Sequence, residues 1–254
     1  MLIINGEDVT TIAYGHWNAI GLKLKTWIEW RYTPQDNLTN CYTEQVHGDG
    51  GLTIINHPFY TPTLTNGFAF DPSLFDGIEV WNGNWDKLDE FDLKWWDGLL
   101  KNGKRMLAIG VSDTHVSSGS PNNPGTPKTI VYANALSQQG IMGGLRRRKA
   151  YITSLPNLSL CLSAECNKQT VGLGDELVAD KNTKVKIKLT FTPLPDATVY
   201  IIGSRGVIRS SKMKDTNQSL MVDAETTSYL RLEIRDANGL MLVITNPIWI
   251  KLKS

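Results

Sequence analysis

Asp113 and His115 stand two positions apart, just after an apolar run at residues 106–111. Side chains at alternate positions of an extended chain face the same side, so an extended conformation would direct the carboxylate and the imidazole together. A stretch rich in Ser, Gly and Pro follows at residues 117–125. In folds with parallel strands, binding sites are built where such strands end. The pair therefore predicts part of a site whose remaining groups must come from elsewhere in the chain.

Two other segments supply histidines in a similar setting. His57 ends a second apolar run, residues 52–55, and the proline that follows it blocks continuation of a strand. Glu7 follows a short apolar run at residues 2–4, and His16 comes nine positions later. Histidine and carboxylate together are ligands for a borderline divalent metal such as zinc, manganese or iron. His47, the fourth histidine, lies in a polar stretch and is expected to be solvated.

The elements that must position these residues alternate in type over residues 1–154. Apolar runs at 52–59, 77–83, 105–113 and 129–134 are of the kind found in parallel strands, which are buried on both faces. Residues 86–103 keep an apolar stripe with helical spacing and end at Gly103, and residues 137–151 predict a further helix. Alternating strands and helices indicate an α/β fold with a parallel sheet or barrel.

The helical pattern disappears after about residue 155. Residues 184–191, 198–203, 229–236 and 240–245 alternate with period two, and Ala-Asn-Gly between the last two predicts a tight hairpin at 236–239. We therefore expect residues 155–254 to form a small antiparallel β-sandwich domain behind a domain spanning residues 1–154.

Composition narrows the classes of partner. The 254 residues carry a formal net charge of +1, and no apolar run approaches the roughly 18–20 residues of a membrane span. We therefore expect a small-molecule substrate and neither a nucleic-acid nor a membrane partner. The three cysteines form no metal-type pair. The first residues do not resemble a signal peptide, which makes a cytoplasmic location the default unless an absent N-terminal segment carried an export signal.

Several segments, taken in order, resemble the PHP metallohydrolase superfamily, named for polymerase and histidinol phosphatase domains. They are GEDVTT, GHWNAIG, GGLTIINHPF, FDGIEVWNG, AIGVSDTH and GTPKTIVYA, and the C-terminal YLRLEIRDANGLMLVITNPIWI is similar to the end of a β-domain in the carbaryl-hydrolase-type branch. The resemblance covers nearly the whole chain.

The resemblance implies a distorted parallel β/α barrel with two or three metal ions at its C-terminal rim. The positions matching the metal ligands are Glu7, as a bridging carboxylate, His16, His57, Asp113 and His115. Metal-activated water would attack a phosphoester or a carbamate or ester bond, with Asp113 as a candidate proton acceptor. Glu79 and Asn82 also match a family segment, and we expect them behind the ligands or beside the substrate.

The chain departs from the family because it contains no His-X-His, the motif that opens PHP proteins and supplies metal ligands. Either the chain is a fragment of a longer protein, or it is a naturally shortened member with an incomplete barrel. Two functions therefore stay open, a metal-dependent hydrolase and a non-catalytic scaffold or binding module. An incomplete barrel exposes a strand edge, so we also expect a homo-oligomer that associates through residues 1–35.

Overall fold

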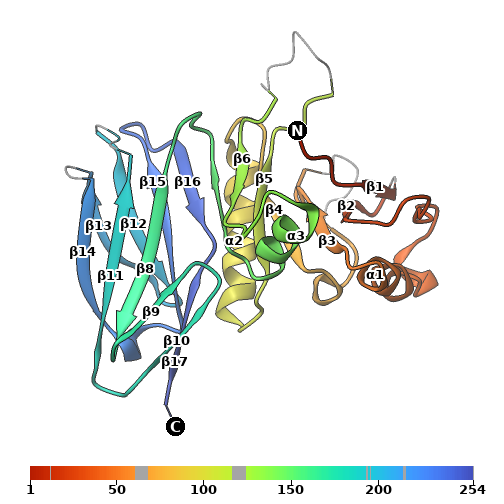
Figure 1. The fold of residues 1–254 in the computed structure, drawn as a ribbon. Helices are drawn as coiled ribbons and strands as arrows, with labels where there is room; N and C mark the ends of the chain where they lie inside the picture. Colours follow the sequence, from red (N-terminus) through yellow and green to blue (C-terminus); the bar gives the residue numbers. More distant parts are fainter. Residues whose placement is uncertain are drawn as a thin grey trace.

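The N-terminal part of the protein is built on one five-stranded sheet. The computed structural model describes residues 1–11, 13–60, 68–115, 124–192, 194, 196–213 and 216–253. The strand order in this sheet is β1-β2-β3-β4-β5 (Figure 1). The strands are β1 (Gly6–Thr11), β2 (Gly15–Ile20), β3 (Leu52–Asn56), β4 (Gly77–Asn82) and β5 (Leu107–Val111).

This sheet is mixed and open. β3, β4 and β5 run parallel, as their fully apolar runs predict, whereas β1 and β2 form an antiparallel hairpin that pairs antiparallel with β3. The expectation of a parallel barrel is therefore corrected, because the described strands close no barrel and β1 forms one edge of the sheet. Residues 2–4, expected to form a strand, lie outside regular structure, and the first strand begins at Gly6.

Three α-helices and three short 3-10 turns accompany the described strands. They are α1 (Thr39–Gly48), α2 (Lys87–Lys101) and α3 (Gln138–Arg146), with η1 (Pro34–Asp36), η2 (Pro72–Leu74) and η3 (Ala224–Thr226). α2 forms where its sequence predicts, because Asp86 caps its first turn in a capping box with Asp89. It stops before Gly103, whose φ of 80° suits glycine.

The two faces of the five-stranded sheet are covered differently. One face packs beneath α1 and α2, where Ile55, Ile78 and Ala108 join one hydrophobic cluster with Trp96 of α2. The opposite face contributes Leu52, Ile54, Leu107 and Ile109 to a smaller cluster with Met142 and Leu145 of α3. α3 packs at one end of that face, and the cavity described below lies at the other end.

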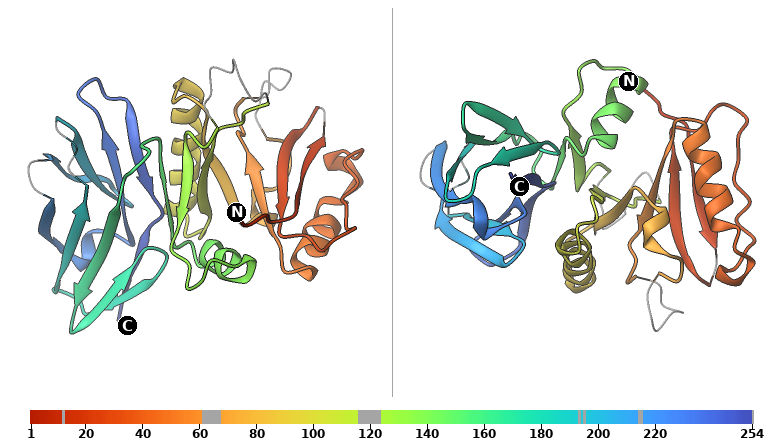
Figure 2. Two further views of the ribbon diagram at one scale, coloured as in Figure 1. Left: turned by 45° about the horizontal axis from the view of Figure 1, so that its top comes forward. Right: turned by 90° about the horizontal axis from the view of Figure 1, so that it is seen from below.

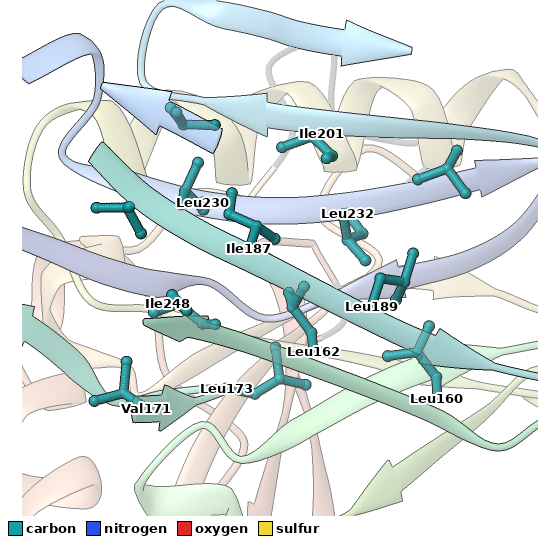
Figure 3. Packing of buried hydrophobic residues seen from close by; sticks show 14 of the residues in the cluster. Leu160, Leu162, Val171, Leu173, Ile187, Leu189, Ile201, Leu230, Leu232 and Ile248 are labelled. Atoms are coloured by element: carbon teal, nitrogen blue, oxygen red, sulfur yellow. The ribbon is translucent and has the colours of Figure 1, made fainter. Parts of the chain in front are cut away.

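The rest of the chain forms two further sheets. The strands are β6 (Lys128–Val131), β7 (Ala150–Thr153), β8 (Leu160–Cys166), β9 (Gln169–Gly172), β10 (Glu176–Ala179), β11 (Lys184–Phe191), β12 (Thr198–Gly203), β13 (Gly206–Lys212), β14 (Asn217–Asp223), β15 (Tyr229–Arg235), β16 (Met241–Thr245) and β17 (Ile248–Leu252). An eight-stranded sheet has the path β10-β17-β15-β16-β7-β6, with β12 and β13 branching from β15, and a four-stranded sheet has the order β14-β11-β8-β9. The inward side chains of both sheets share one core, as Figure 3 shows for Leu162, Ile187 and Leu232.

The antiparallel pattern predicted after residue 155 is confirmed, with one exception, the parallel pair β10–β17. The hairpin at 236–239 is also confirmed, since the amide of Asp236 donates to the carbonyl of Leu240. The prediction for residues 129–134 is wrong, because β6 pairs antiparallel with β7 rather than extending the parallel sheet. β7 pairs in turn with β16 and therefore belongs to the eight-stranded sheet, whereas β8 belongs to the four-stranded sheet. The expected boundary at residue 155 thus falls between strands of two different sheets.

α2 stands between the two parts of the molecule (Figure 2). Its Trp96 and Leu100 belong to the same hydrophobic cluster as Tyr229, Ile244 and Trp249 from the eight-stranded sheet. The sheet that carries the candidate site is thereby packed, through α2, against the C-terminal strands. Within the described part of the chain, no helix has the length and apolar character needed to cross a membrane.

Candidate functional site

A cavity of about 440 Å³ opens at the edge of the five-stranded sheet where β3, β4 and β5 end. Most of the side chains around it are polar or ionisable. The residues that line it are Asp8, Thr10, His16, Asn18, Asn56, His57, Tyr60, Glu79, Val111, Asp113 and His115. The cavity therefore brings together four of the five predicted metal ligands, which are His16, His57, Asp113 and His115.

Strand alternation explains why the first of these side chains share one face. Thr10 on β1 lies opposite His16 on β2, and His16 lies opposite Asn56 on β3. Neighbouring residues across antiparallel strands point to the same side of the sheet, so these three side chains form a row. Asp8 and Asn18 make a second pair, two positions further along the same strands.

The parallel strands deliver the remaining groups at their carboxyl ends. His57 directly follows β3, Glu79 lies in β4, and Asp113 and His115 follow β5. His57 and Asp113 both have positive φ, 24° and 45°, a conformation that few residues other than glycine adopt. Backbone conformations of this kind cost on the order of 1–3 kcal/mol and cluster at functional sites. Two predicted ligands therefore occupy strained positions at the same cavity.

The histidines and Asp113 form two close pairs. The rings of His16 and His57 lie 5.4 Å apart between centroids, and His115 Nε2 lies 3.1 Å from Asp113 Oδ1. Burial, and next the proximity of His16, lowers the pKa of His57. His57 is therefore held as a neutral imidazole at neutral pH, which is the form that binds metals.

Glu79 and Asn82 form a hydrogen-bonded unit beside the cavity. Glu79 is 2 % exposed, and its Oε1 accepts a 2.6 Å hydrogen bond from Asn82 Nδ2. Burial raises the pKa of Glu79 well above its usual range. Burial therefore favours the neutral form of this carboxyl group, which is the form that can donate a hydrogen bond toward the cavity.

Asn56 carries an acceptor that pairs with none of the described residues. The residue is 6 % exposed, its Nδ2 donates to Asp8 Oδ1 at 3.4 Å, and its Oδ1 has no hydrogen-bond partner in the described part of the chain. Buried polar atoms are nearly always paired, so this oxygen in the cavity wall is suited to accept from water or to contact a bound donor or cation.

Glu7, the fifth predicted ligand, does not line the cavity. It shares the helix-covered face of β1 with Val9, and its Oε2 accepts a 2.7 Å hydrogen bond from the amide of Ile28. Asp8 projects into the cavity instead. The strand alternation in GEDVTT could have identified Asp8 as the cavity residue. Val9 belongs to the core face, and Glu7, two positions before Val9, must share that face, which leaves Asp8 on the other one.

The donor set suits a borderline metal in type, since imidazole, carboxylate and amide oxygen are all represented. In the present side-chain positions, the donor atoms do not converge on the position of a single ion. Over the described ranges, no three His, Cys, Asp or Glu side chains lie close enough to hold one ion together. The described side chains form the His16–His57 pair and the Asp113–His115 pair, and Asp8 and Asn56 line the same cavity.

His47 lies away from this cavity, and its Nε2 lies 2.8 Å from Asp76 Oδ2. Its side chain is 42 % exposed, so it provides a matched control for variants of the cavity histidines.

A comparison of the chain with protein-family models finds no matching family, and a comparison with curated proteins finds no match.

Proposed function

We propose that the cavity is the active site of a metal-dependent hydrolase of the PHP type, related to the carbaryl-hydrolase-type branch. One observation carries this proposal: His16, His57, Asp113 and His115, from three segments of the chain, line one cavity at the edge of the sheet where the parallel strands β3, β4 and β5 end. That edge is where α/β folds place their sites. The positive φ angles of His57 and Asp113 support the same conclusion.

His16, His57, Asp113 and His115 would hold the zinc, manganese or iron ion, with Asp8 in place of Glu7. Such an ion supplies an activated water near neutral pH and polarises the oxygen of a phosphoryl or acyl group. Glu79 is buried, hydrogen-bonded to Asn82 and part of the cavity lining, and in the neutral form that burial favours it would donate a hydrogen bond to a substrate oxygen. Asp113 is the candidate proton acceptor. The volume of the cavity suits a small molecule with a phosphoester, carbamate or ester bond.

The alternative is a non-catalytic scaffold or binding module with a degenerate site. It is favoured by the side-chain positions, since no three ligand side chains among the described residues converge. The side chain of His115 in particular is 85 % exposed, and it contacts Asp113. The two functions differ in whether the chain binds a divalent metal.

The first prediction therefore concerns metal binding. The purified chain should bind Zn²⁺ or Mn²⁺ in a calorimetric titration, and His57→Ala should weaken this binding at least about hundredfold, since one ligand is lost from a small set. His47→Ala should leave the affinity within twofold of the wild-type value. Equal affinities for wild type and His57→Ala would contradict the proposed site.

A metal-loaded chain that binds normally but cleaves no aryl phosphate, carboxyl ester or carbamate would favour the scaffold over the hydrolase. Hydrolysis that needs the metal and is lost in His16→Ala and Asp113→Asn would favour the hydrolase.

We also propose that the chain self-associates through residues 1–35. β1 is the edge of its sheet, and Leu24, Trp27 and Trp30 beside it are 84 %, 59 % and 39 % exposed. An exposed edge strand flanked by apolar side chains is an association site.

The second prediction follows from this surface. Sedimentation at micromolar concentration should show a dimer or larger species, and Trp27→Lys should shift it toward monomer because a charge then enters the apolar contact. A stable 28.3 kDa monomer of the wild-type chain would refute self-association.

A further inference from the structure

Two carboxyl groups of α2 face the strand ends that form the cavity. Asp89 and Asp92 lie one turn apart on the same side of the helix and are 2 % and 1 % exposed. Asp89 Oδ1 accepts the amide of Asn82 at 2.9 Å, and Asp92 Oδ1 accepts the amide of Phe59 at 3.1 Å. Each carboxyl group thus holds the backbone at the end of one parallel strand, β4 and β3 respectively.

The turn held by Asp92 is the one that carries His57. His57 has a φ of 24°, and its carbonyl accepts the amide of Tyr60 at 2.9 Å. Pro58 has no amide hydrogen to donate, so the amide of Phe59 is the first donor after His57. Removing Asp92 Oδ1 would leave the amide of Phe59 unpaired beside a buried site. The strained turn at His57 would then lose a hydrogen bond that holds it in place, and it could relax.

Burial makes a carboxyl group at position 92 costly. It raises the pKa of Asp92 to about 8, even though the hydrogen bond from Phe59 acts in the opposite direction. A leucine would fill much of the same volume in an apolar setting at no such cost. Apolar packing alone therefore does not explain a polar side chain at this position, whereas the need for a hydrogen-bond acceptor does.

We propose that Asp92 is a positioning residue that holds His57 in the cavity by accepting the amide of Phe59. This rests on the proposed function in so far as His57 serves as a ligand. Asp92 touches no substrate and acts only through the backbone from residue 57 to residue 59. Its effect is to keep the His57 ring against that of His16, at the centroid separation of 5.4 Å.

The test compares two substitutions of Asp92 in the full chain. Asp92→Leu removes the acceptor, and Asp92→Asn keeps Oδ1 as an acceptor while removing the acid. Asp97→Asn is the matched control, because Asp97 is a buried carboxylate of the same helix whose partners are Lys101 on α2 and Tyr229 and Arg231 on β15. The chain has only four histidines, so their ring protons can be assigned by NMR with single His→Gln variants.

In the metal-free wild type we expect a nuclear Overhauser contact between the rings of His16 and His57. It should persist in Asp92→Asn and Asp97→Asn and disappear in Asp92→Leu, while the signal of His47 stays in place in all of them. The dissociation constant for Zn²⁺ should rise at least tenfold in Asp92→Leu and stay within threefold in Asp92→Asn. A folded Asp92→Leu that keeps both the ring contact and the affinity would overturn the proposal.

Two further outcomes are distinguishable. If the wild type binds no Zn²⁺, the proposed function fails, and the ring contact alone decides whether Asp92 positions His57. If Asp92→Leu does not fold, amide exchange in the wild type decides: the amide of Phe59 should exchange at least a hundredfold more slowly than an unstructured amide, and unprotected exchange would overturn the proposal.

Discussion

Asn246→Leu is expected to lower the free energy of unfolding by about 3–5 kcal/mol, measured by urea denaturation. Asn246 is 0 % exposed, and its side chain joins two strands that are not paired by their backbones. Its Oδ1 accepts the amide of Ala108 on β5 at 2.8 Å, and its Nδ2 donates to the carbonyls of Ala108 and Ala150 at 3.0 and 3.1 Å. Leucine would leave the buried amide and carbonyl of Ala108 unpaired, at roughly 1–3 kcal/mol each, whereas the carbonyl of Ala150 would keep the backbone amide of residue 246.

Asn238→Ala is the control, because Asn238 is an exposed asparagine of the same C-terminal region. Its substitution should change the free energy of unfolding by no more than about 0.5 kcal/mol. If Asn246→Leu were within 1 kcal/mol of wild type, the amide would not be the link between β5 and the eight-stranded sheet.

This link matters because β5 carries the Asp113–His115 end of the cavity. The side-chain amide of Asn246 accepts from and donates to the backbone of Ala108, as the backbone of a neighbouring strand would. It thereby extends the hydrogen bonding of β5 toward β7. The two sheets approach closely here, since a Cβ on Gly110 would lie 2.3 Å from Ile152 Cγ2. The C-terminal sheets therefore brace the strand that positions two candidate ligands.

The elements that the sequence predicts well are those whose signals are local. α2 has an apolar stripe, a capping box and Gly103 just beyond it, and all of these act within a few residues. The alternating strand β11 and the hairpin at 236–239 are equally local. A short apolar run such as residues 129–134 shows burial but not its partner, so the antiparallel pairing of β6 with β7 could not be read from it.

The candidate site was predictable to the same extent. His57, Asp113 and His115 follow apolar runs, and the parallel strands β3 and β5 bring such ends to one edge. The choice between Glu7 and Asp8 depends on which face of β1 is covered, and that is set by the packing of Val9 beneath the helices. The roles of Asn56 and Asp92 could not be predicted, because their partners, Asp8 and the amide of Phe59, lie 48 and 33 residues away.

Arg231→Met should destabilise the chain by about 3–5 kcal/mol in the same denaturation experiment. Arg231 is 3 % exposed and joins β15 to α2, since its Nε and Nη2 donate to Asp97 Oδ1 at 3.1 and 3.0 Å. Its Nη1 donates to Glu233 Oε1 at 2.8 Å, and the guanidinium lies 5.3 Å from the ring centroid of Trp96. Methionine would leave two carboxylates buried with less compensation, and breaking a buried pair in this way costs about 3–5 kcal/mol.

Lys101→Met is the control for Arg231→Met. It also removes a positive charge beside Asp97, but from an exposed position. Lys101 Nζ lies 2.7 Å from Asp97 Oδ2, but its side chain is 43 % exposed, so its loss should cost about 1 kcal/mol or less. Burial favours a raised pKa for Asp97, yet Arg231 and the surrounding hydrogen bonds lower it below its usual value. The lowered pKa adds stability above the unfolded pKa of about 4 that is lost on acidification, and Arg231→Met should remove much of this acid sensitivity. Equal losses for Arg231→Met and Lys101→Met would contradict this, since the buried guanidinium would then add no more stability than the exposed Lys101.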